Sequence, residues 1–309
     1  MNGKQPFSVT VPADVPRQAR QNYIDNYTAI TRATGNLMLF VCDHKLEHLN
    51  RDFYGKDIHP DAMHPGHLFS IASQGTIGAF ATHLGLIARY GMQYPTVNYI
   101  AKLNGKTDLI PTDYRDPQSL LLYDVDDVVT LHKNSGLSLR GVGYTIYLGS
   151  AYESEMLAQA AQVVFKAHQH GLVAVLWIYP RGTCVTDDNS PEMCAGASGV
   201  AAALGSDFVK IKPPQHAESL RIATIAAGNT KVICSGGSAQ PFEQFLQELY
   251  AQLHVGGAAG NATGRTIFQY SQQEAIARTH AIAALVFEDA TVAAALERYR
   301  QSCEPNKGQ

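Results

Sequence analysis

The chain has 309 residues, of which 45% are apolar and 17% charged, an ordinary composition for a globular protein with a substantial core. Its net charge of −3 and the lack of long runs of like charge argue against a nucleic-acid or anionic-membrane surface. No run of about 18 apolar residues could span a membrane, and the first residues lack the apolar core of a signal peptide. Five scattered cysteines without a CxxC pair favour reduced thiols in a cytoplasmic protein.

Apolar runs with strand character alternate with amphipathic helical patterns along the chain. A helical stripe within 152–171 ends at Gly171, and Ser190 followed by Pro191 marks the start of another helix. Helical patterns also cover 241–257 and 272–287. Strands are expected at 37–43, 77–82, 96–103, 139–147, 172–179, 207–212, 231–237 and 257–264, and the last is the weakest because it is rich in Gly and Ala.

This alternation predicts the fold class. Alternating β and α units predict a parallel sheet, and eight strands favour a closed (β/α)8 TIM barrel. No linker or repeat interrupts the pattern, so we expect a single α/β domain over 1–309, with an N-terminal extension over about 1–30. The segment from about 46 to 75 is long and irregular, and we expect it to cover one mouth of the barrel.

Polar and ionisable side chains follow nearly every expected strand. In a barrel the C-terminal ends of the strands meet at one mouth, where barrel enzymes carry out their chemistry. A purely structural barrel does not need such groups there. The strand ends provide Asp43 and His44, Lys102 and Asn104, Tyr147, Tyr179 and Arg181, Lys210 and Lys212, Ser235, Gly236 and Gly237, and Gly264 and Arg265.

The stretch "DFVKIKPP" (207–214) places two lysines in an otherwise apolar strand. Alternation puts Lys210 and Lys212 on one face, about 6.6 Å apart along an extended strand. A second cation and a low-dielectric wall would each lower the pKa of a lysine, and a neutral amine can form a Schiff base with a substrate carbonyl. Spacing alone leaves open that both lysines face solvent on an edge strand.

Three side chains at other strand ends could serve the same chemistry. Tyr179 ends an apolar strand and could move a proton between substrate and solvent, with Trp177 packed beneath it on the same face. Asp43 ends the first strand and could orient a hydroxyl or help dehydrate a carbinolamine. The residues alone leave open that Tyr179 is a core tyrosine and Asp43 a cap.

Two glycine-containing turns predict a phosphate site. "CSGGS" (234–238) and "TGRT" (263–266) each lie between a strand and a helix, where backbone N–H groups can approach an anion, and Arg265 adds a fixed charge. Adjacent sites after the seventh and eighth strands match the phosphate cradle of many barrels, so the turns favour a phosphorylated substrate.

These motifs together resemble a known family. "VCDHKLEH", "AKLNGKT", "VGYTIYLGS", "LWIYPRG", "DFVKIK", "SGGS" and "TGRT" are similar, in the family order and from about residue 37 to 270, to archaeal-type class I fructose-1,6-bisphosphate aldolases (the DhnA/FbaB family). The resemblance implies a (β/α)8 barrel and a Schiff-base aldolase without a metal or other cofactor. It also implies a phosphosugar substrate, no nucleic-acid or membrane partner, and a homo-oligomer in the cytoplasm.

The resemblance also assigns roles to residues. It implies that Lys210 forms the Schiff base, Lys212 lowers the pKa of Lys210, Tyr179 transfers protons and Asp43 handles substrate hydroxyls. The remaining positions are expected to contact the substrate (Trp177, Lys212, Lys102, Arg181, His44) or to bind phosphate (Ser235, Gly236, Gly237, Gly264, Arg265).

Several positions depart from the family pattern. Lys45 stands where glycine is usual, Asn261 and Thr263 replace aliphatic residues of the eighth strand, and Thr266 replaces asparagine. "KPPQ" follows the lysines in place of a more typical "KYTG". These changes fall close to the expected phosphate and sugar sites, so they bear on which phosphosugar is used more than on the imine chemistry.

Three alternatives remain open at this level. Related imine-forming enzymes, such as aminodeoxyheptulosonate synthases, share parts of these motifs. A metal-dependent lyase would use histidines of "HPDAMHPGH" (59–67) with His44 and His48, although their spacing matches no familiar metal site. A non-catalytic barrel would bind a phosphosugar without an adduct at Lys210.

Overall fold

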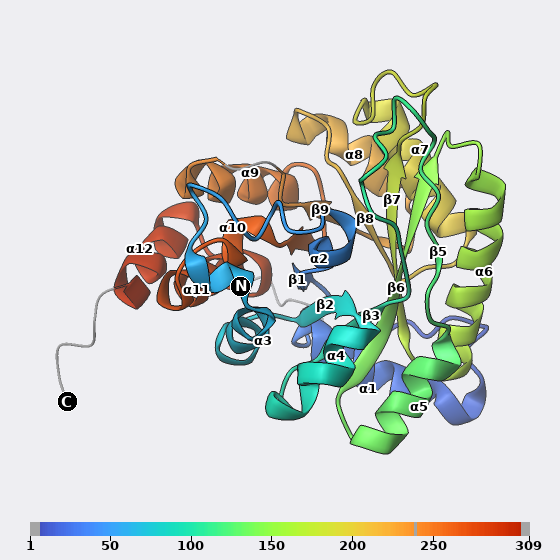
Figure 1. The fold of residues 1–309 in the computed structure, drawn as a ribbon, viewed down its shortest axis with the longest axis horizontal. Helices are drawn as coiled ribbons and strands as arrows, with labels where there is room; N and C mark the ends of the chain where they lie inside the picture. The colour runs from blue at the N-terminus through green and yellow to red at the C-terminus, as the bar shows by residue number, and fades with distance from the viewer. Residues whose placement is uncertain (1–6, 238–239, 304–309) are drawn as a thin grey trace.

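A computed structural model describes residues 7–237 and 240–303 and confirms the closed parallel barrel (Figure 1). The strand order around the barrel is β1-β10-β9-β8-β7-β6-β3-β2, with all neighbours parallel. The barrel strands are β1 (Leu37–Val41), β2 (Ala79–His83), β3 (Tyr99–Lys102), β6 (Leu139–Leu148), β7 (Val173–Pro180), β8 (Phe208–Ile211), β9 (Lys231–Ser235) and β10 (Gly260–Thr263). A separate antiparallel pair consists of β4 (Asn104–Gly105) and β5 (Leu120–Leu121).

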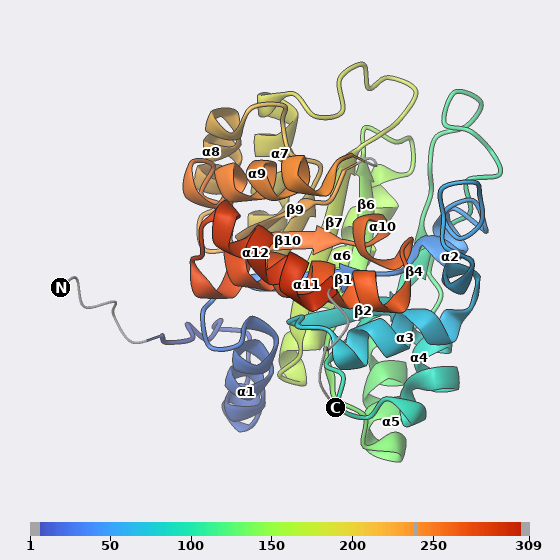
Figure 2. The ribbon, with the colours of Figure 1, turned by 90° about the vertical axis from the view of Figure 1, so that its left-hand side faces the viewer.

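Helices surround the barrel, as Figures 1 and 2 show. The predicted start at Ser190 is confirmed, because its side chain accepts a hydrogen bond from the Met193 N–H and Pro191 is the first helical residue. The helices are α1 (Arg20–Thr31), α2 (His44–Glu47), α3 (Pro65–Gln74), α4 (Leu84–Tyr90), α5 (Val125–Ser135), α6 (Glu153–Gln169), α7 (Pro191–Ala203), α8 (Ala217–Ala226), α9 (Phe242–His254), α10 (Arg265–Phe268), α11 (Gln272–Glu288) and α12 (Val292–Cys303), with 3-10 turns at Arg17–Ala19, Pro60–Met63 and Gly91–Gln93.

The alternation of each strand separates an inner core from an outer one. On β8, Phe208 belongs to the inner core, whereas Val209 and Ile211 pack in the outer core against the helices. The alternation therefore turns Lys210 inward, as predicted. Trp177, its register partner on β7, also lies in the inner core.

Helix α1, drawn in blue at the bottom of Figure 1, packs against the N-terminal ends of the strands. Tyr23 and Tyr27 belong to the inner core, and the Tyr27 ring stacks on Phe208 at 5.3 Å between centroids. His168 of α6 lies beside this helix and is held between two carboxylates, with Nδ1 2.8 Å from Asp14 and Nε2 3.2 Å from Asp207. The N-terminal end of the barrel is thus filled with aromatic rings and held by the contacts of His168 with two carboxylates.

The prediction of an irregular 46–75 segment is wrong for its last third. Pro65 begins α3, where its missing N–H costs nothing and its fixed φ suits the first helical position. His67 of α3 lies 3.1 Å from the carbonyl oxygens of both Phe268 and Tyr270, which ties the helix to the end of α10. Among the described residues, no helix is long and apolar enough to cross a membrane.

Candidate active site

A cavity of about 450 Å³ opens at the C-terminal ends of the strands. It collects the residues that the sequence placed at the barrel mouth, with the exception of Lys102 and Asn104. The predicted residues that line it are Asp43, His44, Tyr147, Trp177, Tyr179, Arg181, Lys210, Lys212, Ser235, Gly236, Gly237, Gly264 and Arg265. Glu47, His48, Thr145, Asp188, Ala262 and Thr266 complete the wall.

Lys210 projects from β8 into this cavity and is only 6% exposed. Its Nζ lies 5.7 Å from the centroid of the Trp177 ring. Burial lowers the pKa of the Lys210 amine, Asp43 opposes this, and the positive charge of Arg265 lowers it further. The site therefore favours a neutral amine more than water does, which is the state a nucleophilic lysine requires.

Lys212 lines the same cavity as Lys210, but the expectation that it lowers the pKa of Lys210 is not supported, because burial and Arg265 lower that pKa. β8 ends at Ile211, because neither Pro213 nor Pro214 has a backbone N–H to continue the ladder. The Lys212 side chain is 45% exposed, and its Nζ donates to the Asp188 Oδ1 at 2.6 Å. Lys212 lies at the rim of the cavity. The second cation that lowers the pKa of Lys210 is the guanidinium of Arg265.

Asp43 follows β1 and begins α2, so its carboxylate lies low in the cavity and is 7% exposed. Burial alone would raise its pKa, but His44, Lys210 and Lys102 outweigh burial and lower it to about 2. Burial lowers the pKa of the neighbouring His44 to about 4. Near pH 7 the site therefore contains an ionised Asp43 beside a neutral imidazole.

Two tyrosines in register lie on β6 and β7, Tyr147 beside Tyr179. The Arg181 guanidinium lies 5.7 Å from the Tyr147 ring centroid and 5.9 Å from that of Tyr179. Burial raises the pKa of both phenols. Both therefore keep their protons near neutral pH and can donate a hydrogen bond to a substrate oxygen.

Lys102 does not line the cavity, although it ends β3 at the barrel mouth. It is fully buried, and its Nζ donates to the Asn104 carbonyl at 2.8 Å and to the Asn104 Oδ1 at 3.0 Å. The same nitrogen lies 5.7 Å from the Trp177 ring centroid and 3.8 Å from the Glu47 Oε1. Lys102 thus lies inside the barrel, behind the cavity wall and next to Trp177.

The two predicted phosphate turns lie together at the ends of β9 and β10. Gly237 has φ +69°, a conformation that favours glycine, and its carbonyl accepts a hydrogen bond from Arg265 Nη2 at 3.0 Å. At Gly264 a Cβ atom would lie 2.3 Å from the Val41 carbonyl and 2.7 Å from His44 Cε1, so only glycine fits. Ser238 of the first turn lies outside the described residues.

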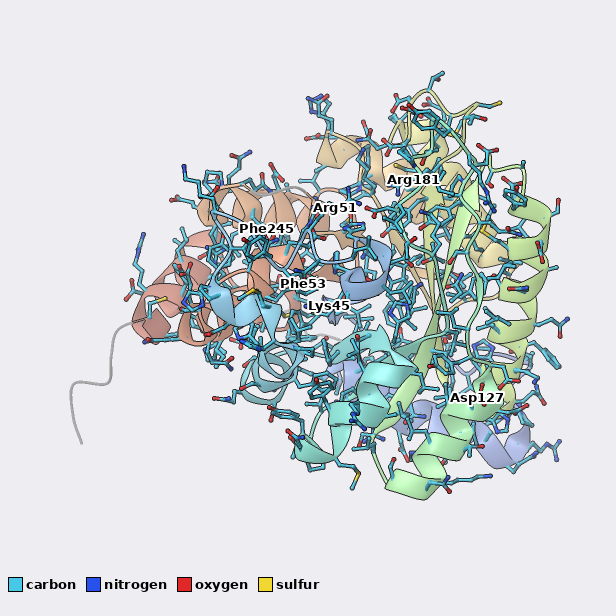
Figure 3. All side chains as sticks on the ribbon, viewed as in Figure 1. Lys45, Arg51, Phe53, Asp127, Arg181 and Phe245 are labelled. Atoms are coloured by element: carbon cyan, nitrogen blue, oxygen red, sulfur yellow. The ribbon has the colours of Figure 1, made fainter. Side chains whose placement is uncertain are left out.

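Most of the departures from the family pattern lie away from the cavity. Lys45 and Phe53, both labelled in Figure 3, lie side by side, with Lys45 Nζ 4.0 Å from the Phe53 ring centroid. Asn261 donates to Thr263 Oγ1 at 2.6 Å and lies on the outer side of β10, near α9. Thr266 is the exception, since it lines the cavity.

The sequence reasoning did not identify Glu47 as a site residue, considered His48 only as a metal ligand, and did not single out Asp52. The short helix α2 turns Glu47 and its neighbour His48 into the cavity. His48 Nδ1 lies 2.6 Å from Asp52 Oδ2, and Asp52 Oδ1 lies 3.7 Å from Arg265 Nη1. The motif "DHKLEH" carried a usable signal, because residues three and four apart share one face of a helix.

Of the histidines considered as metal ligands, His44 and His48 lie near each other, with ring centroids 5.3 Å apart, whereas His59 and His67 contact other groups. Over residues 7–237 and 240–303, no group of three His, Cys, Asp or Glu side chains could hold a metal ion. His59 lies 3.4 Å from Asp61, whereas His67 faces two backbone carbonyls. The donor set of this loop therefore does not fit a metal centre.

Comparison with known proteins places the chain in a family. Residues 37–270 match the model of the DeoC/LacD family of aldolases. A fructose-bisphosphate aldolase/6-deoxy-5-ketofructose 1-phosphate synthase of Methanocaldococcus jannaschii is 50% identical over 94% of each chain. A class 1 fructose-bisphosphate aldolase of Halobacterium salinarum is 32% identical over 85% of this chain and 95% of its own.

Solved structures agree with this placement. A fructose-bisphosphate aldolase from Slackia heliotrinireducens superposes with a TM-score of 0.95 at 48% identity, over 99% of this chain and 98% of its own. An archaeal fructose-1,6-bisphosphate aldolase whose catalytic lysine carries a carbinolamine intermediate superposes at 0.74 with 32% identity, over 85% and 98%. The chain therefore belongs to the DeoC/LacD family of aldolases, among the archaeal-type class I fructose-bisphosphate aldolases that its sequence resembles.

Proposed function

We propose that the protein is a lyase that reversibly cleaves fructose 1,6-bisphosphate to dihydroxyacetone phosphate and glyceraldehyde 3-phosphate through an imine on Lys210. The observation that carries this proposal is the position of the Lys210 amine. It is buried on the cavity wall beside Trp177, between the Asp43 carboxylate and the cradle of Gly237, Gly264 and Arg265. The named activities of the relatives support the same chemistry.

Imine formation begins when the neutral amine adds to the substrate ketone. The carbinolamine then loses water and becomes an iminium ion, whose positive charge the ionised Asp43 stabilises. Tyr179 lies on the strand next to Lys210 and, as a protonated phenol, can supply the proton that the leaving hydroxyl needs. The phosphate of the ketone half would bind the backbone N–H groups of the glycine turns and the Arg265 guanidinium.

Cleavage uses the iminium as an electron sink. The bond between the third and fourth carbons breaks, its electron pair forms an enamine, and the fourth carbon becomes the aldehyde of the released half. Protonation of the enamine and hydrolysis of the imine then free dihydroxyacetone phosphate and Lys210. Condensation runs through the same steps in reverse.

Trapping the imine tests the proposal. Borohydride reduction in the presence of dihydroxyacetone phosphate, followed by peptide mass spectrometry, should show the reduced adduct on Lys210 alone. Lys212→Met, a lysine of the same cavity, should keep the adduct, and Lys210→Met should lose it. An unmodified wild-type protein, or an adduct on Lys102 or Lys212, would refute the assignment.

Two assays separate this reaction from its alternatives. Cleavage of fructose 1,6-bisphosphate measured beside aminodeoxyheptulosonate synthesis distinguishes the related imine enzymes. Activity that persists in EDTA distinguishes imine from metal chemistry. Assembly into a homo-oligomer and a cytoplasmic location stay predictions, and light scattering measures the first.

A second activity is favoured by the name of the 50% identical relative, which includes 6-deoxy-5-ketofructose 1-phosphate synthase. Cleavage of that sugar between its third and fourth carbons would give dihydroxyacetone phosphate and methylglyoxal. The ketone half is the same, and only the aldehyde differs. Incubation with these two compounds should give the six-carbon product if this chain accepts an aldehyde without a phosphate.

A further inference from the structure

The order of the strands gives the cavity a direction. The cradle residues Gly237 and Gly264 follow β9 and β10, and Lys210 lies on the adjacent β8. Continuing around the barrel, Tyr179 lies on β7 and Tyr147 on β6. A ketone phosphate held in the cradle, with its carbonyl at Lys210, therefore directs the aldehyde half of the sugar towards β7 and β6.

On this side of the cavity lies a carboxylate that the imine steps do not use. Glu47 reaches the cavity wall from α2, and its side chain is 12% exposed. Its Oε2 accepts a hydrogen bond from the Tyr147 hydroxyl at 3.4 Å, and catalytic hydrogen bonds are often this long without substrate. Its Oε1 is buried, lies 3.8 Å from Lys102 Nζ and has no hydrogen-bond partner among the described residues.

Two carboxylates of the cavity, Asp43 and Glu47, are in opposite electrostatic situations. Cationic neighbours hold the pKa of Asp43 at about 2, which makes it a weak base. Burial raises the pKa of Glu47 above its ordinary value, and Lys102 only partly opposes this. Two carboxyl groups whose environments separate their pKa values commonly divide the work between stabilising charge and moving protons.

We propose that Glu47 and Tyr147 form a second acid–base pair, which exchanges the proton of the hydroxyl on the aldehyde half of the sugar. This inference rests on the proposed function. When the carbon–carbon bond breaks, the fourth-carbon hydroxyl becomes a carbonyl and gives its proton to the Tyr147 oxygen, while the Tyr147 proton passes to the Glu47 carboxylate. In condensation the same protons return to the new hydroxyl. Lys210, Tyr179 and Asp43 therefore act on the ketone half of the sugar, and Glu47 and Tyr147 act on the aldehyde half.

The charges around Glu47 come from several elements, and any pH dependence must include them. Lys102 on β3 and Lys106 beyond β4 favour the ionised carboxylate, whereas the Asp43 carboxylate disfavours it. The groups that face Glu47 are Asp43, His48, Lys102, Lys106, Tyr147, Tyr179 and Lys210. Glu47→Gln leaves all of them in place, and Lys102 keeps both of its Asn104 acceptors.

The proposal is tested by measuring two reactions of the same variant and comparing how much each one slows. The first is hydrogen exchange of dihydroxyacetone phosphate with D₂O, which needs only imine and enamine formation. The second is cleavage of fructose 1,6-bisphosphate. Glu47→Gln should retain the borohydride adduct and exchange at near wild-type rates but lose at least about 100-fold in cleavage, the lower bound for a lost proton-transfer group.

Tyr147→Phe should show the same split, and the double variant should be no slower than the slower single variant, because the two residues act as one unit. Glu297→Gln, on the exposed face of α12, is the matched control and should change neither reaction. The pH profile of wild-type cleavage should have an acid limb whose pKa lies above that of an ordinary glutamate. This limb should disappear in Glu47→Gln, and a merely structural role of Glu47 would not produce that change.

The outcomes separate this inference from the proposed function. Equal loss of exchange and cleavage in Glu47→Gln would assign Glu47 to imine formation or to folding and overturn the inference, and unchanged cleavage would overturn it too. A wild-type protein without a Lys210 adduct would instead refute the proposed function, and that measurement is made before any Glu47 variant is tested.

Discussion

Replacing His168 with glutamine tests how much the contacts of its imidazole stabilise the N-terminal end of the barrel. The imidazole is fully buried between Asp14 and Asp207. Burial alone would lower its pKa, but the two carboxylates outweigh burial and raise it from the ordinary 6.5 to about 9. Asp207 also accepts hydrogen bonds from the Tyr23 hydroxyl and, at 2.7 Å, from the Ala174 N–H, so the protonated ring lies at the centre of a buried network.

The magnitude follows from the difference between the folded and unfolded pKa values. At about 1.4 kcal/mol per pKa unit, a rise from 6.5 to about 9 corresponds to roughly 3 kcal/mol of folding stability. Because the folded-state pKa is the higher one, this contribution is complete below pH 6.5 and is lost as the pH rises through about 9.

Urea unfolding of the wild type and of His168→Gln between pH 6 and pH 10 measures this contribution. The gap between their unfolding free energies should shrink by about 3 kcal/mol over that range. His170 is an exposed histidine two residues after His168, and His170→Gln controls for a general effect of losing an imidazole. A gap that stays constant with pH would refute the reasoning, because His168 would then be neutral in the folded protein.

Three further substitutions test the site. Tyr179→Phe should keep the Lys210 adduct but slow turnover by about 10²–10⁴-fold, and unchanged turnover would remove this phenol from the mechanism. Lys45→Ala should cost about 1 kcal/mol or less in thermal unfolding and leave kcat/KM within about twofold, since the ammonium packs on an aromatic ring outside the cavity; a large loss of kcat/KM would place it in the site. Gly264→Ala should raise KM for the bisphosphate and destabilise the fold by about 1–3 kcal/mol, because its Cβ would meet a backbone carbonyl of β1, whereas Gly66→Ala, with open space around it, should do neither.

The sequence predicted the barrel and most of the cavity because apolar periodicity and strand ends carry that information directly. Each expected strand overlaps an observed one, including the weak Gly- and Ala-rich run that becomes β10. Once eight parallel strands close, their C-terminal ends must meet. The glycine turns and Arg265 then lie together without any further signal.

The errors arose where a local interaction overrides the pattern. Alternation predicted the inward direction of Lys210, but the two prolines after Lys212 end β8 before alternation reaches that residue. Lys102 ends its strand as expected, yet Asn104 two residues later binds its ammonium group behind the wall. Glu47 reaches the cavity only through the turn of α2, which no strand pattern describes.

The placement of the cradle and the tyrosines on separate arcs of one closed barrel has a consequence for how such an enzyme can diversify. Substitutions at Glu47 or on β6 can reshape the receptor for the incoming electrophile without disturbing the nucleophile or its anion clamp on β8, β9 and β10. One scaffold can thereby keep a fixed three-carbon donor and change its acceptor by a few side chains.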